Sequence, residues 1–268
     1  MSLAFTSPLR RSLRAISVSM VLFALVFIAS CKMDEDTNDT PSDNNPQTTF
    51  GQPGAGGTDQ EGDAFTSVII GSQEWMSENL NVASYTDGTP IPYYTHDELI
   101  GLTIGAWTES YNGRLYNWYA VAGIYDEASA ANPALRKQLA PDGWHVPSDS
   151  EWTTMINFLD PTADGGNNYY NDAGGMMKTA GTNQDGTGLW NAPNTMANNA
   201  SGFSGDPAGY LTHYGYFEEP FSVAYWWSST EFDIDRAWNR NLHYQYGNVS
   251  RRSDLEKGWG FSVRCMRD

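Results

Sequence analysis

Three carboxylates alternate along the chain near its C-terminal end, at Glu231, Asp233 and Asp235. Alternate side chains of a β-strand point to the same face, so this spacing would gather the three acids. Gathered carboxylates can bind Ca²⁺, and a suitably spaced pair of acids can cleave a glycosidic bond. The alternative interpretation is the solvated end of a strand. We keep calcium at these acids as a candidate and predict no other metal or cofactor.

Paired aromatic residues are the second candidates for chemistry, here the recognition of a ligand. Trp226 and Trp227 are adjacent and must point to opposite faces of a strand, so one is expected in the core and the other either covered or exposed. An exposed tryptophan, or the pair Tyr93-Tyr94, would stack on a sugar ring or pack against a partner protein. Core packing is the alternative interpretation. The candidate ligand-binding residues are Trp226, Trp227, Tyr93, Tyr94 and Trp238.

The remaining reactive residues do not form a known catalytic motif. The run from Gly202 to Asp206 breaks the G-x-S-x-G pattern of serine hydrolases at its fifth position. The histidines lack the H-E-x-x-H spacing of zinc sites, and we interpret them as structural or surface residues. They are His96, His145, His213 and His243. We therefore predict no catalytic residue.

The start of the chain has the features of an export signal. Three arginines precede an apolar run, residues 15–29, that is too short to span a bilayer core of roughly 30 Å. The run ends in Ile28-Ala29-Ser30-Cys31, which resembles the lipobox of bacterial lipoproteins, where the thiol accepts a diacylglyceryl group. We predict a signal peptide over residues 1–30 and lipidation of Cys31, which would anchor the protein to the bacterial outer membrane. An ordinary cleaved signal and an uncleaved anchor are the alternatives.

Residues 31–62 are predicted to form a lipid-anchored, disordered stalk, because they contain almost no large apolar side chains. The acidic run from Asp34 to Asp36 resembles surface-export signals of Bacteroidetes lipoproteins, and a merely solvated tether is the alternative. Residues 63–268 would then form one globular domain. If Cys31 carries lipid, Cys265 has no disulfide partner in this domain.

The chain is strongly acidic, with a formal net charge of −17. Removing the three arginines of the signal would make it −20. Nucleic-acid binding needs clustered Lys and Arg, so this composition argues against a nucleic-acid partner. Tyr, Trp and Phe make up 13% of the chain. Such side chains suit small aromatic clusters, and they also suit a sugar-binding surface.

The domain is expected to combine short strands, few helices and long loops. Residues 66–76 predict a β-hairpin, and residues 115–121 favour a short helix. Ser148 and Glu151 form a capping box, which predicts a helix that ends at Asp160-Pro161. Residues 160–209 are rich in Gly, Asn and Asp, so we expect long loops there, and loops on a rigid scaffold often carry binding residues.

Three strands are expected in the last part of the chain, at residues 225–230, 236–246 and 260–267. The last of these alternates strictly, with Phe261, Val263 and Cys265 on one face. This pattern predicts that Cys265 is a small buried core residue.

Five segments, taken in order, resemble the Fibrobacter-type major paralogous domain family (FISUMP). They are Gln73–Val82 (QEWMSENLNV), Gly113–Val121 (GRLYNWYAV), Leu139–Trp152 (LAPDGWHVPS with Glu151-Trp152), Trp226–Thr230 (WWSST) and Gly260–Cys265 (GFSVRC). The resemblance covers about residues 65–268. It implies a secreted or lipid-anchored bacterial surface protein with no established activity.

The same segments distantly resemble the C-type-lectin-like fold of formylglycine-generating enzymes, which implies an α+β domain with much ordered loop. Those enzymes use cysteines for oxidation, whereas this domain has only Cys265, so that activity is not expected. Calcium-dependent lectins carry Glu-Pro-Asn or Trp-Asn-Asp motifs. The runs beginning at Glu219 and Trp238 each miss the decisive residue.

We predict a non-enzymatic surface module that binds a glycan or protein ligand for adhesion or nutrient capture. A polysaccharide-active enzyme that uses paired carboxylates is one alternative. A structural subunit of a surface assembly is the other.

Overall fold

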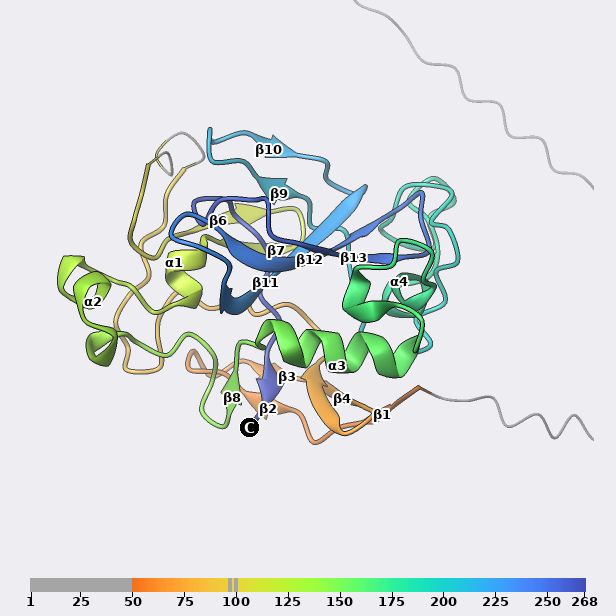
Figure 1. Ribbon diagram of the computed structural model, residues 1–268, viewed down its shortest axis with the longest axis horizontal. Coiled ribbons are helices and arrows are strands. Elements are labelled where there is room, and N and C mark those ends of the chain that lie inside the picture. Colours follow the sequence, from red (N-terminus) through yellow and green to blue (C-terminus); the bar gives the residue numbers. More distant parts are fainter. Residues whose placement is uncertain (1–49, 96–97, 99–100) are drawn as a thin grey trace, which may run out of the picture. The chain divides into compact units, whose positions relative to one another are not determined.

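A computed structural model describes residues 50–95, 98 and 101–268. The predicted signal peptide, Cys31 and most of the predicted stalk lie outside the described residues. In the described part of the chain, no helix is long and apolar enough to cross a membrane. Short antiparallel sheets and few helices make up this part, so it is a mixed α+β domain as expected (Figure 1).

The largest sheet brings the first and last strands together, in the order β1-β4-β5-β14-β8. Strands β4 (Ser67–Ile70) and β5 (Gln73–Met76) form the hairpin that the sequence predicts. Strand β14 (Met266–Arg267) pairs with β5 on one side and with β8 (Trp144–His145) on the other. The C-terminal segment therefore lies inside this sheet.

The predicted end of the stalk at residue 62 is wrong, because residues 50–62 are part of the domain. Strand β1 (Gly51–Pro53) pairs with β4, and β2 (Gly57–Thr58) pairs with β3 (Ala64–Phe65). Strands β1 and β2 lack large apolar side chains, and they are held through their backbone. One such contact is the hydrogen bond of 2.7 Å that Arg267 Nη2 donates to the Gly56 carbonyl. Composition therefore does not reveal them.

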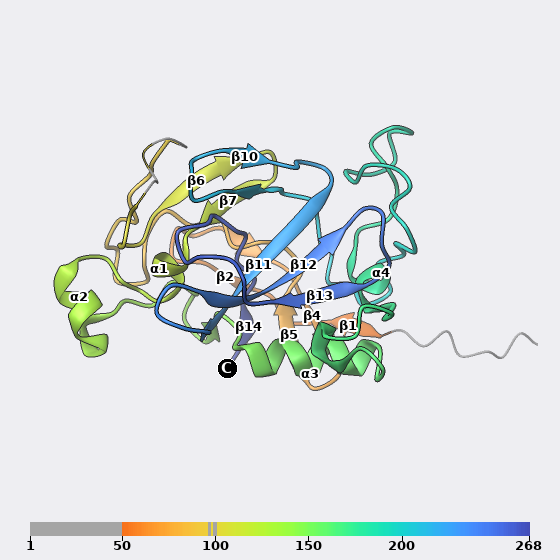
Figure 2. The same ribbon diagram turned by 45° about the horizontal axis from the view of Figure 1, so that its top comes forward.

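A second sheet contains β11 (Val223–Glu231), β12 (Ala237–His243) and β13 (Val249–Arg252) in sequence order. Two hairpins, β6 (Trp107–Ser110) with β7 (Gly113–Tyr116) and β9 (Tyr210–Leu211) with β10 (Phe217–Glu218), lie together away from α3 (Figures 1 and 2). A third, smaller apolar cluster that includes Leu115 and Leu211 joins the two hairpins.

Helix α3 (Asp149–Leu159) begins at the predicted capping box, in which Ser148 and Glu151 each accept a hydrogen bond from the other's backbone N–H. The other α-helices are single short turns: α1 (Trp118–Val121), α2 (Glu127–Ala131) and α4 (Ala173–Met177). Two 3₁₀ turns are η2 (Pro133–Leu135) and η3 (Asp164–Gly166). The helix favoured at residues 115–121 is therefore only partly right, because β7 extends to Tyr116 before α1 begins.

Strand β11 separates two apolar cores. Trp227 belongs to the first core, with Phe261 and Val263, whereas Trp226 belongs to the second, with Trp152 of α3 and Trp75 of β5. Neither Trp226 nor Trp227 has any exposed surface. The interpretation that one of the pair lies on the surface and contacts a ligand is therefore wrong, because each face of β11 is covered by a core.

The segment 260–265 crosses the domain interior and is buried on both sides. Cys265 is buried, as predicted. However, Ser262 and Arg264, on the opposite face, are buried too. Only Met266–Arg267 pairs as a strand, while Phe261 and Ser262 make isolated bridges to Tyr116 and Trp226. Alternation in this segment distinguishes two buried environments rather than an inner and an outer face.

Candidate functional site

The acids Glu231, Asp233 and Asp235 are not gathered on one strand face. Strand β11 ends at Glu231, and the other two acids lie in the turn that follows. Lys257 Nζ lies 2.9 Å from Glu231 Oε1, and Arg236 forms an ion pair with Asp233. Among the residues that the structure describes, no group of three or more His, Cys, Asp or Glu side chains is arranged to hold a metal ion. Glu231 and Asp233 thus each have a basic partner within the protein.

The other predicted ligand-binding aromatics pack against the domain's own side chains. Tyr93 is 51% exposed, and its ring lies 4.8 Å from that of Trp107. Tyr94 is half-buried against the third apolar cluster. Trp238 is half-buried beneath the guanidinium of Arg251, 3.5 Å from the ring centroid. None of the three lines either of the two cavities described next.

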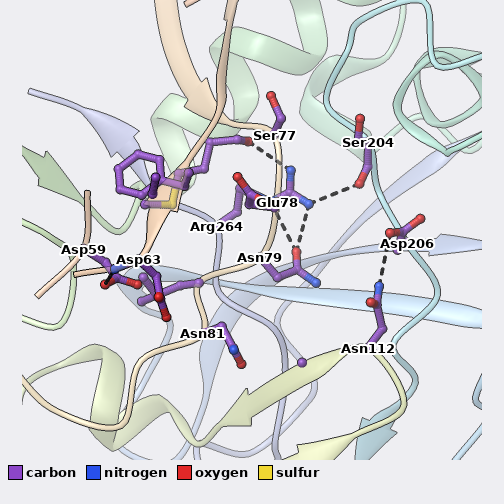
Figure 3. Close-up of a pocket in the computed structure, with 15 residues that line it drawn as sticks. Asp59, Asp63, Ser77, Glu78, Asn79, Asn81, Asn112, Ser204, Asp206 and Arg264 are labelled. Carbon is purple, nitrogen blue, oxygen red and sulfur yellow. Dashed lines mark hydrogen bonds between the residues drawn. The ribbon is translucent and has the colours of Figure 1, made fainter. Parts of the chain in front are cut away.

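The first is a polar cavity of about 390 Å³ between the β5–β6 connection, the β2–β3 hairpin and residues 204–206 (Figure 3). Its polar lining consists of carboxylates, amides and hydroxyls around one guanidinium. These side chains are Asp59, Asp63, Ser77, Glu78, Asn79, Asn81, Asn112, Ser204, Asp206 and Arg264. The residues from Ser77 to Asn81, Gly113 and Arg264 also belong to segments on which the family resemblance rests.

Arg264 forms the base of the polar cavity, and its hydrogen bonds serve the fold. It donates to the carbonyls of Met76 and Phe203 and, from Nη2, to Asn79 Oδ1 at 2.8 Å. Its guanidinium lies 4.2 Å from the Phe203 ring centroid. Burial lowers the pKa of Arg264, and the carboxylates of Asp206 and Glu78 oppose that effect from across the cavity. These acids therefore help to balance a buried positive charge.

Three of the four acids of the polar cavity also anchor neighbouring chain segments. Asp206 accepts hydrogen bonds from Thr179 (2.6 Å) and Asn112 (3.2 Å). Glu78 accepts from the Thr66 backbone, and Asp59 caps the turn that leads to β3. The cavity is thus polar and negatively charged, but three of its acids also accept hydrogen bonds that hold neighbouring segments in place.

The second cavity is a groove of about 590 Å³ over one face of the β11–β13 sheet; we call it the tyrosine groove. Its floor follows the strand register. Tyr225, Asn241 and Ser250 lie opposite one another on β11, β12 and β13, and Val223 lies opposite His243 in the next row. Residues directly opposite in an antiparallel sheet share a face, so these side chains form a continuous floor.

Tyrosines from two loops and from strand β9 form the walls of the tyrosine groove. Tyr169 and Tyr170 come from the connection between η3 and α4 and are 67% and 94% exposed. Tyr246 comes from the β12–β13 turn, and Tyr210 comes from β9. The Tyr210 ring also packs edge-on against Tyr225, with centroids 5.3 Å apart. A ligand in this groove would contact aromatic rings on several sides.

The polar groups of the tyrosine groove differ in how far the protein itself uses them. Asp254 holds the guanidinium of Arg252 with two hydrogen bonds, of 3.0 and 2.6 Å. His243 Nδ1 accepts from the Gln245 N–H, which leaves Nε2–H of the neutral ring as a donor. Burial lowers the pKa of His243, so the neutral ring is the form present at pH 7. Asn241 Oδ1 is buried and has no hydrogen-bond partner among the described residues.

The sequence does not predict this groove, although part of the signal is present. Residues 160–209 are expected to form loops suited to binding, and the exposed pair Tyr169-Tyr170 lies there. The contributions of Tyr210 and Tyr246 depend on loop packing across the sheet. Their spacing in the sequence therefore carries no sign of a shared site.

The five segments of the family resemblance meet in the interior of the domain. Asn79, Trp226 and Arg264, from three of these segments, share hydrogen bonds, and Trp227 Nε1 donates to the Tyr116 carbonyl at 2.9 Å. The model of the Fibrobacter succinogenes major domain matches residues 68–267, which is well over half of the chain. No curated protein and no solved structure matches the chain. The chain is therefore a member of the Fibrobacter succinogenes major domain family.

Proposed function

We propose that this protein is a non-enzymatic binding module that captures a glycan in the tyrosine groove. The observation that carries the proposal is the set of tyrosines around one sheet face, with polar groups on the floor between them. They are Tyr169, Tyr170, Tyr210, Tyr225 and Tyr246. The apolar face of a sugar ring packs on such aromatic rings, while its hydroxyls bond to amide, imidazole and phenol groups.

The tyrosines suit this role chemically. Burial and the nearby Glu219 carboxylate raise the pKa of Tyr210 to about 12, so its hydroxyl stays protonated and can donate a hydrogen bond. Tyrosine also loses little conformational entropy on binding, because it has only two side-chain torsions. Exposed rings such as Tyr170 would therefore gain contact area at modest entropic cost.

We further propose that lipid on Cys31 anchors the module to the outer membrane, facing outward, with the residues before Phe50 as a tether. The basic start, the short apolar run and the small residues before Cys31 support this location. The C-type-lectin-like arrangement is our proposal for the finer description of the α+β fold. It is supported by the position of Pro147-Ser148 at the start of α3 and by the buried course of residues 260–265.

The test is a glycan-array screen of the purified protein, run once with calcium and once with EDTA. Tyr170→Ala should abolish or strongly weaken any specific binding, and its exposed position should leave the fold intact. Tyr93→Ala is the matched control, because Tyr93 is also exposed but lies outside the groove. Binding that survives EDTA supports recognition by aromatic and polar side chains alone. Loss of binding in EDTA would implicate calcium and the acidic residues Glu231, Asp233 and Asp235. Absence of all binding contradicts the proposal.

A polysaccharide-active enzyme is the second candidate function, and the polar cavity is the observation that favours it. Glycoside hydrolysis requires two carboxylates that flank the scissile bond. The tyrosine groove contributes a single carboxylate, Glu219, whereas the polar cavity has four. Release of new reducing ends from a polysaccharide by the wild type, but not by Glu78→Gln or Asp206→Asn, would support this alternative.

A further inference from the structure

We propose that the tyrosine groove selects uncharged glycans and excludes uronate-containing ones, through Asn241 as the recognition residue and the Arg252–Asp254 pair as the charge filter. This inference rests on the proposed glycan-binding function. It adds the class of ligand and the residues that determine it.

Asn241 is the polar group on the groove floor that the protein leaves unused. Its Oδ1 is buried and unpaired among the described residues, and a buried acceptor without a donor is destabilising. Asn241 lies on β12, the middle strand of the floor, between Tyr225 of β11 and Ser250 of β13. The amide NH₂ can donate to a sugar hydroxyl, and a rotation of the amide that exposes Oδ1 would let a hydroxyl satisfy this acceptor.

His243 supplies a donor two residues further along the same strand face. Because Nδ1 accepts from the Gln245 backbone, the ring orientation and tautomer are fixed, and Nε2 carries the proton. The floor thus offers an acceptor and donors in adjacent rows. This pattern matches the hydroxyls of a neutral sugar, each of which can donate and accept.

Recognition of a carboxylate would need a cation, and the groove's cation is already neutralised. Of the described residues that line the groove, Arg252 is the only one with a permanent positive charge. Asp254 binds its Nε and Nη2 with two parallel hydrogen bonds, the geometry that a uronate would otherwise take. Glu219 adds a negative charge to the same groove. A uronate would therefore meet repulsion and no free cation.

The experiment measures the affinity of the purified protein for matched pairs of oligosaccharides that differ only at C6. Cello- and galacto-oligosaccharides serve as neutral probes, and their C6-oxidised uronate forms serve as charged ones. We expect the wild type to bind a neutral member of these pairs and to bind its uronate form at least about tenfold more weakly. Equal affinity for both forms overturns the inference but leaves the proposed function standing. If neither form binds while other glycans do, the proposed ligand class is wrong. If no glycan binds, the proposed function fails.

Two variants test which residues determine the preference for neutral glycans over uronates. Asn241→Ala should weaken neutral-glycan binding about tenfold, with thermal unfolding recorded to show that the variant is folded. Asp254→Asn should free Arg252 and raise uronate affinity about tenfold, while neutral binding stays constant. Asp254 is largely exposed, so this variant should fold. Glu256→Gln makes the same change of net charge nearby without touching Arg252 and should have no such effect. An unchanged uronate affinity in Asp254→Asn would refute the charge filter.

Discussion

The indole Nε1 of Trp226 donates a hydrogen bond of 2.8 Å to Oδ1 of Asn79, 147 positions earlier in the chain. The same oxygen accepts hydrogen bonds from Nε and Nη2 of Arg264, at 3.2 and 2.8 Å. Three segments of the family resemblance therefore converge on one amide oxygen. Asn79, Trp226 and Arg264 therefore have a structural role at this junction.

Replacing Asn79 should destabilise the domain. Asn79→Ala leaves the Trp226 indole and part of the Arg264 guanidinium without an acceptor, and we expect a loss of about 2–4 kcal/mol in the free energy of unfolding. Urea denaturation followed by tryptophan fluorescence measures it. Asn81→Ala, at an exposed position two residues on, should change stability by less than about 0.5 kcal/mol. Equal effects of the two substitutions would contradict the role of the junction.

Asp149 should stabilise the domain through two arginines, and the effect should depend on pH. Its carboxylate accepts hydrogen bonds from Arg240 (2.8 Å) and Arg251 (2.6 Å), and Arg240 is fully buried. Asp149→Asn leaves the Arg240 charge without its partner, so we expect a loss of about 3 kcal/mol at pH 7. Exposed Asp142→Asn is the control and should be nearly neutral.

The pH dependence of Asp149 follows from its pKa. Burial by itself would raise this pKa, but the hydrogen bonds of Arg251 and the charge of Arg240 outweigh it and lower the pKa below 3.8. A lowered folded-state pKa means that the stabilisation is fully present above 3.8 and is lost as the pH falls through the folded-state value. The stability difference between wild type and Asp149→Asn should shrink in that range. A difference that stays constant there would show that the ion pairs do not set it.

Lys178 should stabilise the backbone at one end of the tyrosine groove. Its buried ammonium donates to the carbonyls of Thr195 and Tyr246 at 2.8 Å and of His243 at 3.1 Å. Lys178→Met leaves these carbonyls without their donor, and we expect a loss of about 2–3 kcal/mol at pH 7. Lys137→Met removes an ammonium that pairs with Asp87 at the surface, and it should lower the stability far less, because solvent screens this pair.

Alkaline pH gives a second measurement on Lys178. Burial lowers its pKa from 10.5 to about 8, so between these values the unfolded chain binds a proton that the folded protein does not. Stability linked to this group is therefore lowest below pH 8 and rises towards pH 10.5. The stability of wild type relative to Lys178→Met should increase over that interval. A decrease would mean that the three carbonyls raise the pKa instead.

Local signals in the sequence were sufficient for the elements whose determinants are local. The capping box of Ser148 and Glu151 fixed the start of α3, and β-branched residues around a Gly-Ser turn predicted the β4–β5 hairpin. Burial of Cys265 followed from alternation. In each case neighbouring residues along the chain carry the information.

The failures share a different cause. Strand β1 depends on backbone pairing with β4, which a polar composition conceals. Burial of both Trp226 and Trp227 depends on cores assembled from distant segments, and Trp238 is covered by Arg251 across a strand pair. The tyrosine groove likewise exists only after two loops and strand β9 pack over one sheet. Such relationships are tertiary, so no window of sequence contains them.

The position of β11 between the two cores has a consequence for how the domain loses its structure. Because Trp226 and Trp227 anchor opposite faces of one strand, neither core can come apart without removing a wall of the other. Partial opening that exposes one tryptophan while sparing its neighbour is therefore disfavoured. The domain should melt as a single cooperative unit, with no long-lived half-folded species.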